Sequence, residues 1–214
     1  GTVGVQVKEY MWGAVAGVGD GKFWELRGGA QLGHLWTDPT TTEALQPESV
    51  SRGAVIARLT ADNRDNVPFP TRGGALRVTM DWETPALGAD ESTRRLQGIG
   101  MGAFAFGKNV FQLLAAGGSP VKTDLPYYDG FRLGGFRRLS GYRQDELMGP
   151  YMAYGSVTYL REINRFKTSI IGGAYYLGMS LEAGNVWLNG SDVSFSSLRY
   201  AGSVFIGIDS PLGP

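Results

Sequence analysis

The sequence predicts an all-β fold, and three observations predict it. Glycine and proline, which both interrupt helices, supply 33 and 10 of the 214 residues, so long helices are disfavoured. Apolar and polar residues alternate with period two in several long segments, which places them on opposite faces of a strand. No apolar run reaches the roughly 18 residues of a membrane-spanning helix. The longest candidates, 98–107 and 168–181, are short and rich in glycine.

The first half of the chain contains four expected strands. Segment 2–18 alternates weakly and is expected to be the first. In segment 23–36, alternate residues are mostly apolar, with a tryptophan near each end, and most of the residues between them are polar or glycine. This pattern fits a strand with one face in an apolar environment and the other in a polar one. Segment 50–62 is weaker. Segment 74–83 has the clearest pattern, with one apolar face ending in Trp82 and one charged face.

The second half of the chain contains five more expected strands. Segments 94–107, 109–118 and 151–162 alternate less regularly, because glycine and alanine interrupt them. Segment 171–183 has an apolar face opposite a face of glycine, serine and glutamate, and segment 197–209 alternates without a break. Since no helical pattern of comparable strength lies between these nine segments, the whole chain is interpreted as antiparallel β-structure.

Two all-β architectures have strands with one apolar and one polar face, namely a soluble sandwich and a transmembrane barrel. Strand length and loop pattern favour the barrel, because roughly 9 to 11 tilted residues cross a bilayer and several segments are that long. The connections also alternate between long and compact, as barrel connections do. The long ones are 38–48, 85–93 and 119–150, and the compact ones are 18–22 and 63–73. A glycine-rich soluble sandwich is the alternative.

Composition excludes several classes of function. The 20 basic residues balance the 20 acidic ones, so no net field would attract nucleic acid, and no nucleic-acid partner is expected. With no cysteine and only His34, the chain cannot build a thiol nucleophile, a cysteine-ligated zinc site or a histidine-based metal site. It also contains no Gly-x-Ser-x-Gly nucleophile motif. We therefore expect no metal, no cofactor and no enzymatic activity in this segment.

Four ordered motifs in residues 50–214 resemble the BamA-like bacterial surface antigen superfamily of outer-membrane barrels, which includes assembly factors and two-partner secretion transporters. The segment LGGFRRLSGY is most similar to the C-terminal barrel of patatin-like phospholipases of the autotransporter type. The motifs are DNRDNVPFPTRG at Asp62–Gly73, LPYYDGFRLGGFRRLSGY at Leu125–Tyr142, LEAGNVW at Leu181–Trp187 and DSPLGP at Asp209–Pro214.

The resemblance implies a sixteen-stranded antiparallel transmembrane β-barrel in the bacterial outer membrane. The nine segments would be about nine of those sixteen strands, the sixth to the fourteenth, so residues 1–214 would be part of one barrel domain. The long loop at about 119–150 would fold inward into the lumen. The chain is then expected to belong to a longer polypeptide, whose partners are outer-membrane lipid and its own upstream passenger or periplasmic domain. A homodimer is a further candidate.

The same resemblance points to a contact between this loop and an acidic residue on the wall. In the superfamily an arginine directly precedes a glycine–aromatic pair in the loop and reaches an aspartate on a strand. Here Ser140 precedes Gly141 and Tyr142, and Glu182, close to Gly184, stands in place of the aspartate, so both partners depart from the pattern.

A neighbouring arginine can replace the missing one. Residues two apart share a face of an extended segment, so Arg138 is predicted to pair with Glu182, since a guanidinium can grip a carboxylate with two hydrogen bonds. The alternative is that Arg137, Arg138 and Arg143 are solvated charges of the lumen or the loop. Gly134, Gly135 and Gly141 are expected to permit close backbone approach in the folded-back loop.

These observations lead to a hypothesis of function with two alternatives. The segment is expected to anchor or translocate an attached passenger domain at the outer membrane, with a patatin-like lipase as the passenger. A passive porin or ligand-binding barrel without a polypeptide client is the first alternative, and the long glycine-rich loop argues against it. A soluble sandwich used for adhesion is the second alternative.

Overall fold

The computed structural model describes residues 5–39, 48–166 and 173–209, which form one antiparallel sheet of nine strands. The strands follow one another in chain order, with β9 paired directly to β6. The prediction of nine antiparallel strands is confirmed. Parts of the expected segment 171–183, of loop 38–48 and of the DSPLGP motif lie outside the described residues. The strands are β1 Val5–Gly19, β2 Trp24–Pro39, β3 Glu48–Asp62, β4 Gly73–Glu83, β5 Arg94–Phe106, β6 Asn109–Pro120, β9 Tyr151–Phe166, β10 Gly173–Trp187 and β11 Arg199–Asp209.

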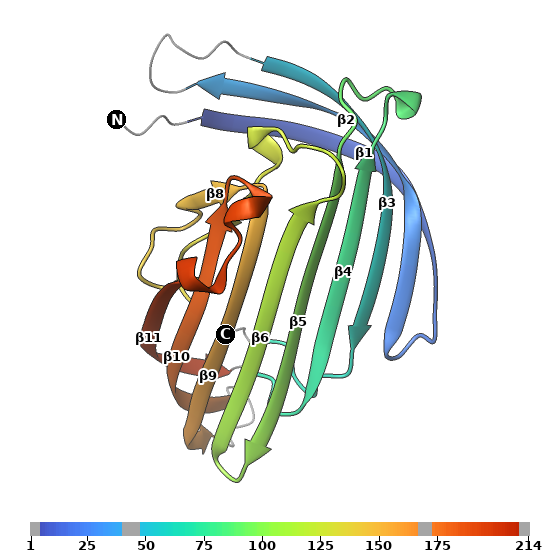
Figure 1. The fold of residues 1–214 in the computed structure, drawn as a ribbon. Helices are drawn as coiled ribbons and strands as arrows, with labels where there is room; N and C mark the ends of the chain where they lie inside the picture. The colour runs from blue at the N-terminus through green and yellow to red at the C-terminus, as the bar shows by residue number, and fades with distance from the viewer. Residues whose placement is uncertain (1–4, 40–47, 167–172, 210–214) are drawn as a thin grey trace.

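The sheet curves like a section of a barrel wall, and its connections differ between the two ends (Figure 1). The connections 84–93, 121–150 and 188–198 lie at the end drawn at the top, whereas 20–23, 63–72 and 107–108 lie at the bottom, where only 63–72 is as long as 84–93. Transmembrane barrels show this asymmetry between their extracellular and periplasmic ends. Short 3₁₀ turns occur in the long connections at Pro85–Leu87, Tyr127–Asp129, Gly190–Asp192 and Phe195–Ser197. None of the helices in the described ranges is long and apolar enough to cross a membrane.

The outer face of the sheet is apolar and exposed. The register places Leu113 opposite Val157 on this face, and Leu181 beside them is 74% exposed. Aromatic side chains lie at the two ends of β2, Trp24 at its bottom end and Trp36 near its top end. The ring centroid of Trp36 lies 5.3 Å from that of Tyr10. A soluble sandwich would cover such a face with a second sheet, but within the described ranges this face stays open, as in a barrel surrounded by lipid.

The inner face of the sheet is polar and is partly covered by the chain itself. The connection 121–150 folds back against this face and contains a short hairpin, β7 Phe131–Leu133 and β8 Leu147–Gly149, which the sequence did not predict (Figure 1). Its side chains Leu133 and Leu139 are buried in one cluster with Tyr154 of β9. The inner face therefore lines a lumen that this segment, called the inward loop below, occupies as predicted.

Candidate functional site

The inward loop is held by a carboxylate on the wall, Glu182 of β10. This residue follows the lipid-facing Leu181, so the strand alternation directs it into the lumen, where it is 3% exposed. Its Oε2 accepts hydrogen bonds from the backbone N–H groups of Leu139 at 2.7 Å and Ser140 at 2.9 Å. Its Oε1 accepts the hydroxyls of Ser140 at 2.7 Å and Ser180 at 2.5 Å. Four donors thus converge on one buried carboxylate.

The predicted pair between Arg138 and Glu182 does not form. Arg138 instead donates to the carbonyl oxygen of Arg132 at 2.8 Å and lies 3.8 Å from the carboxylate of Asp145, with its side chain 55% exposed. The prediction assumed an extended chain, but Leu139 adopts a φ of 70° and the residue before Arg138 a φ of 57°. Because the chain turns here, residues two apart do not share a face. The turn presents consecutive backbone N–H groups to the carboxylate, an arrangement that binds anions.

Arg137, and not Arg138, is the arginine of this turn that contacts polar side chains of the wall. Its Nη2 donates to Oε1 of Gln112 at 2.9 Å and to Oγ1 of Thr158 at 3.3 Å, and its carbonyl oxygen accepts the hydroxyl of Tyr154 at 2.6 Å. The backbone N–H of Arg137 donates to Oγ of Ser140 at 3.0 Å, which links this arginine to the Glu182 contact. The sequence contained one usable signal, the adjacent glycines just before this point, which indicate a reversal and not an extended chain.

The three loop glycines have different roles. Gly134 and Gly135 have φ values of 130° and 105°, a region in which side chains are strained. A Cβ on Gly134 would also collide with the carbonyl oxygen of Arg143, so this residue needs both the conformation and the space. Gly141 has a φ outside this region and open space at its Cβ position, so close approach does not require a glycine there.

The other two predicted residues pack beside the Glu182 contact. The hydroxyl of Tyr142 accepts a hydrogen bond from Nη1 of Arg199 on β11 at 3.0 Å, and the guanidinium lies 5.4 Å from the ring centroid. Gly184 of β10 faces Leu133 of the loop, whose Cδ2 lies 3.1 Å from the position of an added Cβ. The loop therefore contacts both β10 and β11.

Replacement of Gly184 with alanine is expected to destabilise the protein by about 1–3 kcal/mol, because cores resist added volume. The new Cβ would lie 2.8 Å from the carbonyl oxygen of Ala153 and 3.0 Å from Cδ2 of Tyr154. Thermal unfolding of the detergent-solubilised full-length protein, followed by circular dichroism, measures the loss. Gly102→Ala is the control, since no atom lies within 4 Å of its added Cβ. Equal stability of the two variants would contradict the expected close packing at Gly184.

A second contact holds the start of the inward loop near the top of the lumen. Arg52 of β3 contacts Glu83 of β4, with Nε 2.6 Å from Oε1, and its Nη2 lies 2.8 Å from Oδ1 of Asp129 in the loop. Nη1 of Arg52 also lies 3.1 Å from Glu9 of β1. Arg95 of β5 donates to the carbonyl oxygen of Asp129 at 3.3 Å. This cluster borders a polar cavity of about 420 Å³ between the loop and the wall.

The chemistry of these contacts is structural. Within the described ranges, no group of three His, Cys, Asp or Glu side chains is placed to hold a metal ion. The lumenal carboxylates are engaged in holding the chain, as shown by Glu182, by Glu83 and by Asp81, which lies 3.2 Å from Arg95. The arrangement therefore supports docking of a segment inside the lumen.

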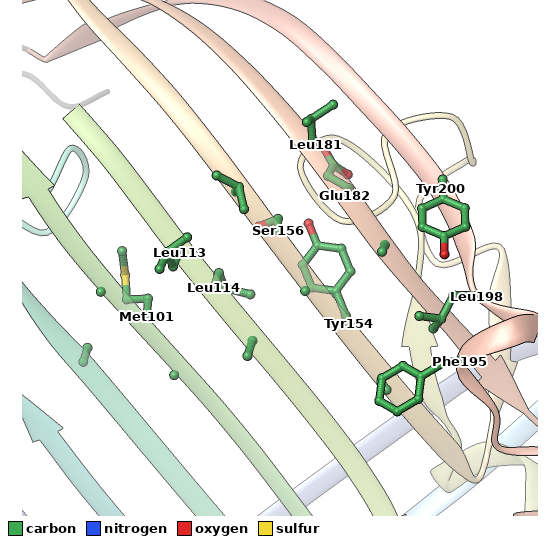
Figure 2. A pocket seen from close by; sticks show the side chains of 18 residues that line it. Met101, Leu113, Leu114, Tyr154, Ser156, Leu181, Glu182, Phe195, Leu198 and Tyr200 are labelled. Carbon is green, nitrogen blue, oxygen red and sulfur yellow. The ribbon is translucent and has the colours of Figure 1, made fainter. Parts of the chain in front are cut away.

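The outer wall is thin at the level of the Glu182 contact. A mostly apolar cavity of about 980 Å³ lies across β5, β6, β9, β10 and β11, and Figure 2 shows that Glu182 is one of the residues that line it. Gly100, Ala115, Gly155 and Ala183 are partners on successive strands and form part of this lining. Small side chains therefore separate lipid from the loop-binding face here.

Comparisons with known proteins agree with this architecture. A sequence model of the Omp85 superfamily domain matches residues 31–214. The crystal structure of BamA from Haemophilus ducreyi lacking POTRA domains 1–3 is similar in fold, with a TM-score of 0.74 at 11% identity. The match covers 97% of this chain and 51% of that chain, so this chain spans about half the length of that structure. No curated protein matches the chain.

Proposed function

Because the chain belongs to the Omp85 superfamily, we propose that it is part of a barrel domain that anchors or translocates an attached passenger domain. The chain lies in the bacterial outer membrane, where its apolar outer face contacts lipid. The Omp85 barrel is a transporter domain and not an enzyme. In this proposal residues 1–214 are a section of one barrel domain.

The observation that carries this proposal is the inward loop held at Glu182. A passive porin needs an open water-filled lumen, whereas here the loop is fixed to the wall at Glu182 and again at Arg52. A segment held by a few discrete polar contacts has a docked and a released state. Ser140, Glu182 and the Gly134–Gly135 pair, whose positive φ values turn the chain, are the residues that set the balance between them.

The proposed passenger is a patatin-like lipase upstream of residue 1. The loop sequence LGGFRRLSGY supports this choice, because we interpret it as resembling the barrels attached to such lipases. Terminal sequencing and intact mass of the parent polypeptide test it. An upstream domain with a Gly-x-Ser-x-Gly nucleophile motif is expected, and an upstream region of another kind would replace the lipase by a different passenger.

Planar-bilayer recordings distinguish this proposal from a passive porin. We expect the full-length protein to show low, intermittent conductance, because the loop occupies the lumen, and Glu182→Ala to increase the open time by releasing it. The lipid-facing variant Leu181→Ala is the control and should conduct like the parent protein. A large, steady conductance in the parent protein would instead favour a porin.

A further inference from the structure

The connection 63–72, called the lower turn below, also enters the lumen, from the end opposite the inward loop. Its Phe69 is buried and stacks on Tyr176 of β10, with ring centroids 5.3 Å apart and an interplanar angle of 14°. Val110 of β6 and Leu160 of β9 complete the cluster around this ring. The lower turn starts from β3 and β4, so Phe69 reaches strands well beyond its own hairpin partners.

The surface of β11 that contacts the lower turn fits it in shape and in hydrogen bonding. A Cβ on Gly207 of β11 would lie 2.7 Å from Cε1 of Phe69, so this glycine leaves room for the ring. Nδ2 of Asn66 donates to Oδ2 of Asp209 on β11 at 2.9 Å. Asp65 holds the turn itself by accepting the backbone N–H of Thr71 at 2.8 Å. Burial opposes ionisation of Asp65, but hydrogen bonds from Thr71 and Arg72 lower its pKa below the ordinary value.

Gln112 of β6 joins the lower turn to the inward loop. This residue is buried, with 4% of its surface exposed. Nε2 donates to the carbonyl oxygen of Pro70 in the turn at 3.0 Å, and Oε1 accepts from Nη2 of Arg137 in the loop at 2.9 Å. A buried amide needs both its donor and its acceptor satisfied. Gln112 meets this need only when the turn and the loop are both in place.

Phe205 of β11 makes a second link between the same two segments. It packs against the cluster around Phe69 of the turn. On the loop side, its ring centroid lies 5.2 Å from that of Phe136 at an angle of 88°, and Arg137 lies over it at 5.4 Å. Its ring also occupies the space where Gly178 would carry a Cβ. The aromatic contacts therefore continue from the turn into the loop.

We infer that the lower turn is a second lumenal plug, and that Gln112 and Phe205 couple its docking to that of the inward loop. Release of either segment then weakens the seat of the other, because a coupling free energy acts equally in both directions. This goes beyond the proposed function and does not depend on the identity of the passenger. Gln112 acts by positioning the lower turn and the inward loop relative to each other.

Hydrogen exchange of the full-length protein in detergent micelles tests the coupling. Gln112→Leu keeps the volume and removes both hydrogen bonds. We expect about tenfold faster exchange of two sets of amides, those of Leu139 and Ser140 in the loop and that of Thr71 in the turn. The control is Gln97→Leu on the lumenal face of β5, which should change neither set. If only one of the two segments responds to Gln112→Leu, the coupling is refuted.

An engineered crosslink tests the same inference in the opposite direction, by replacing the hydrogen bond between Asn66 and Asp209 with a covalent link. The chain has no cysteine, so Asn66→Cys combined with Asp209→Cys offers a single disulfide between the lower turn and β11. Closing it should slow exchange at Leu139 and Ser140 in the inward loop severalfold, and reduction should reverse this. Unchanged loop exchange in the oxidised protein, with the disulfide verified by mass spectrometry, overturns the inference.

Discussion

Replacement of Glu182 with alanine is expected to release the inward loop from the wall. The carboxylate accepts four hydrogen bonds from the loop and from β10, and bonds to a buried charged group contribute about 1.5–3 kcal/mol each. Alanine leaves the backbone N–H groups of Leu139 and Ser140 without this acceptor. We expect their hydrogen exchange to accelerate by about a hundredfold, which corresponds to about 3 kcal/mol.

Two variants distinguish the lost carboxylate from a general loss of stability. Glu182→Gln keeps an oxygen for the two backbone N–H groups, and hydroxyls of Ser140 and Ser180 can rotate to accept from the new amide. It should therefore accelerate exchange by about tenfold. Leu181→Ala, on the opposite face of the same strand, should leave exchange unchanged. Parental exchange in Glu182→Ala would show that the carboxylate does not hold the loop.

Replacement of Arg52 with methionine is expected to destabilise the protein by about 3–5 kcal/mol. The guanidinium contacts Glu83 and Asp129, both buried, and removing one partner of a buried ion pair leaves uncompensated charge. Two carboxylates would face each other here without their shared cation. Urea unfolding of the full-length protein in detergent, followed by tryptophan fluorescence, measures the loss.

A charge-neutral variant shows whether the electrostatics or the lost side chain causes this effect. Arg52→Met combined with Glu83→Gln and Asp129→Asn should recover much of the stability, because both buried carboxylates are then neutral and only the exposed Glu9 loses its charged partner. Arg58→Met is the matched control, since this lumenal arginine is exposed, and should change stability by less than about 0.5 kcal/mol. A loss for Arg52→Met no larger than that of the control would contradict the expected role of the cluster.

The strands could be predicted from the sequence because their two faces meet different media. Glu182 was placed on the polar face by alternation alone, and its hydrogen bonds with Leu139 and Ser140 of the inward loop place it there in the structure. The hairpin β7–β8 was missed, because three-residue strands inside a loop are too short to show periodicity. The alternation of apolar and polar residues thus identifies the strands of the wall, but it does not predict the structure within the inward loop.

The candidate site was only partly predictable. The sequence pointed to the loop and to Glu182, which are in contact in the structure, but it selected Arg138 because alternation was extended into a segment that turns at Arg137 and Leu139. Gln112 and Phe69 gave no local signal. Their importance comes from contacts between segments distant in the chain, and single-sequence patterns carry no information about such contacts.

The hydrogen bond between Asn66 and Asp209 joins residues 143 positions apart. Contacts of such long range form late, because the chain between them must first be ordered. The space beside Gly207 that the Phe69 ring occupies forms only when β11 has paired with β10. We therefore expect the lower turn to dock only after β11 has paired with β10, so that its docking reports that the sheet is fully formed.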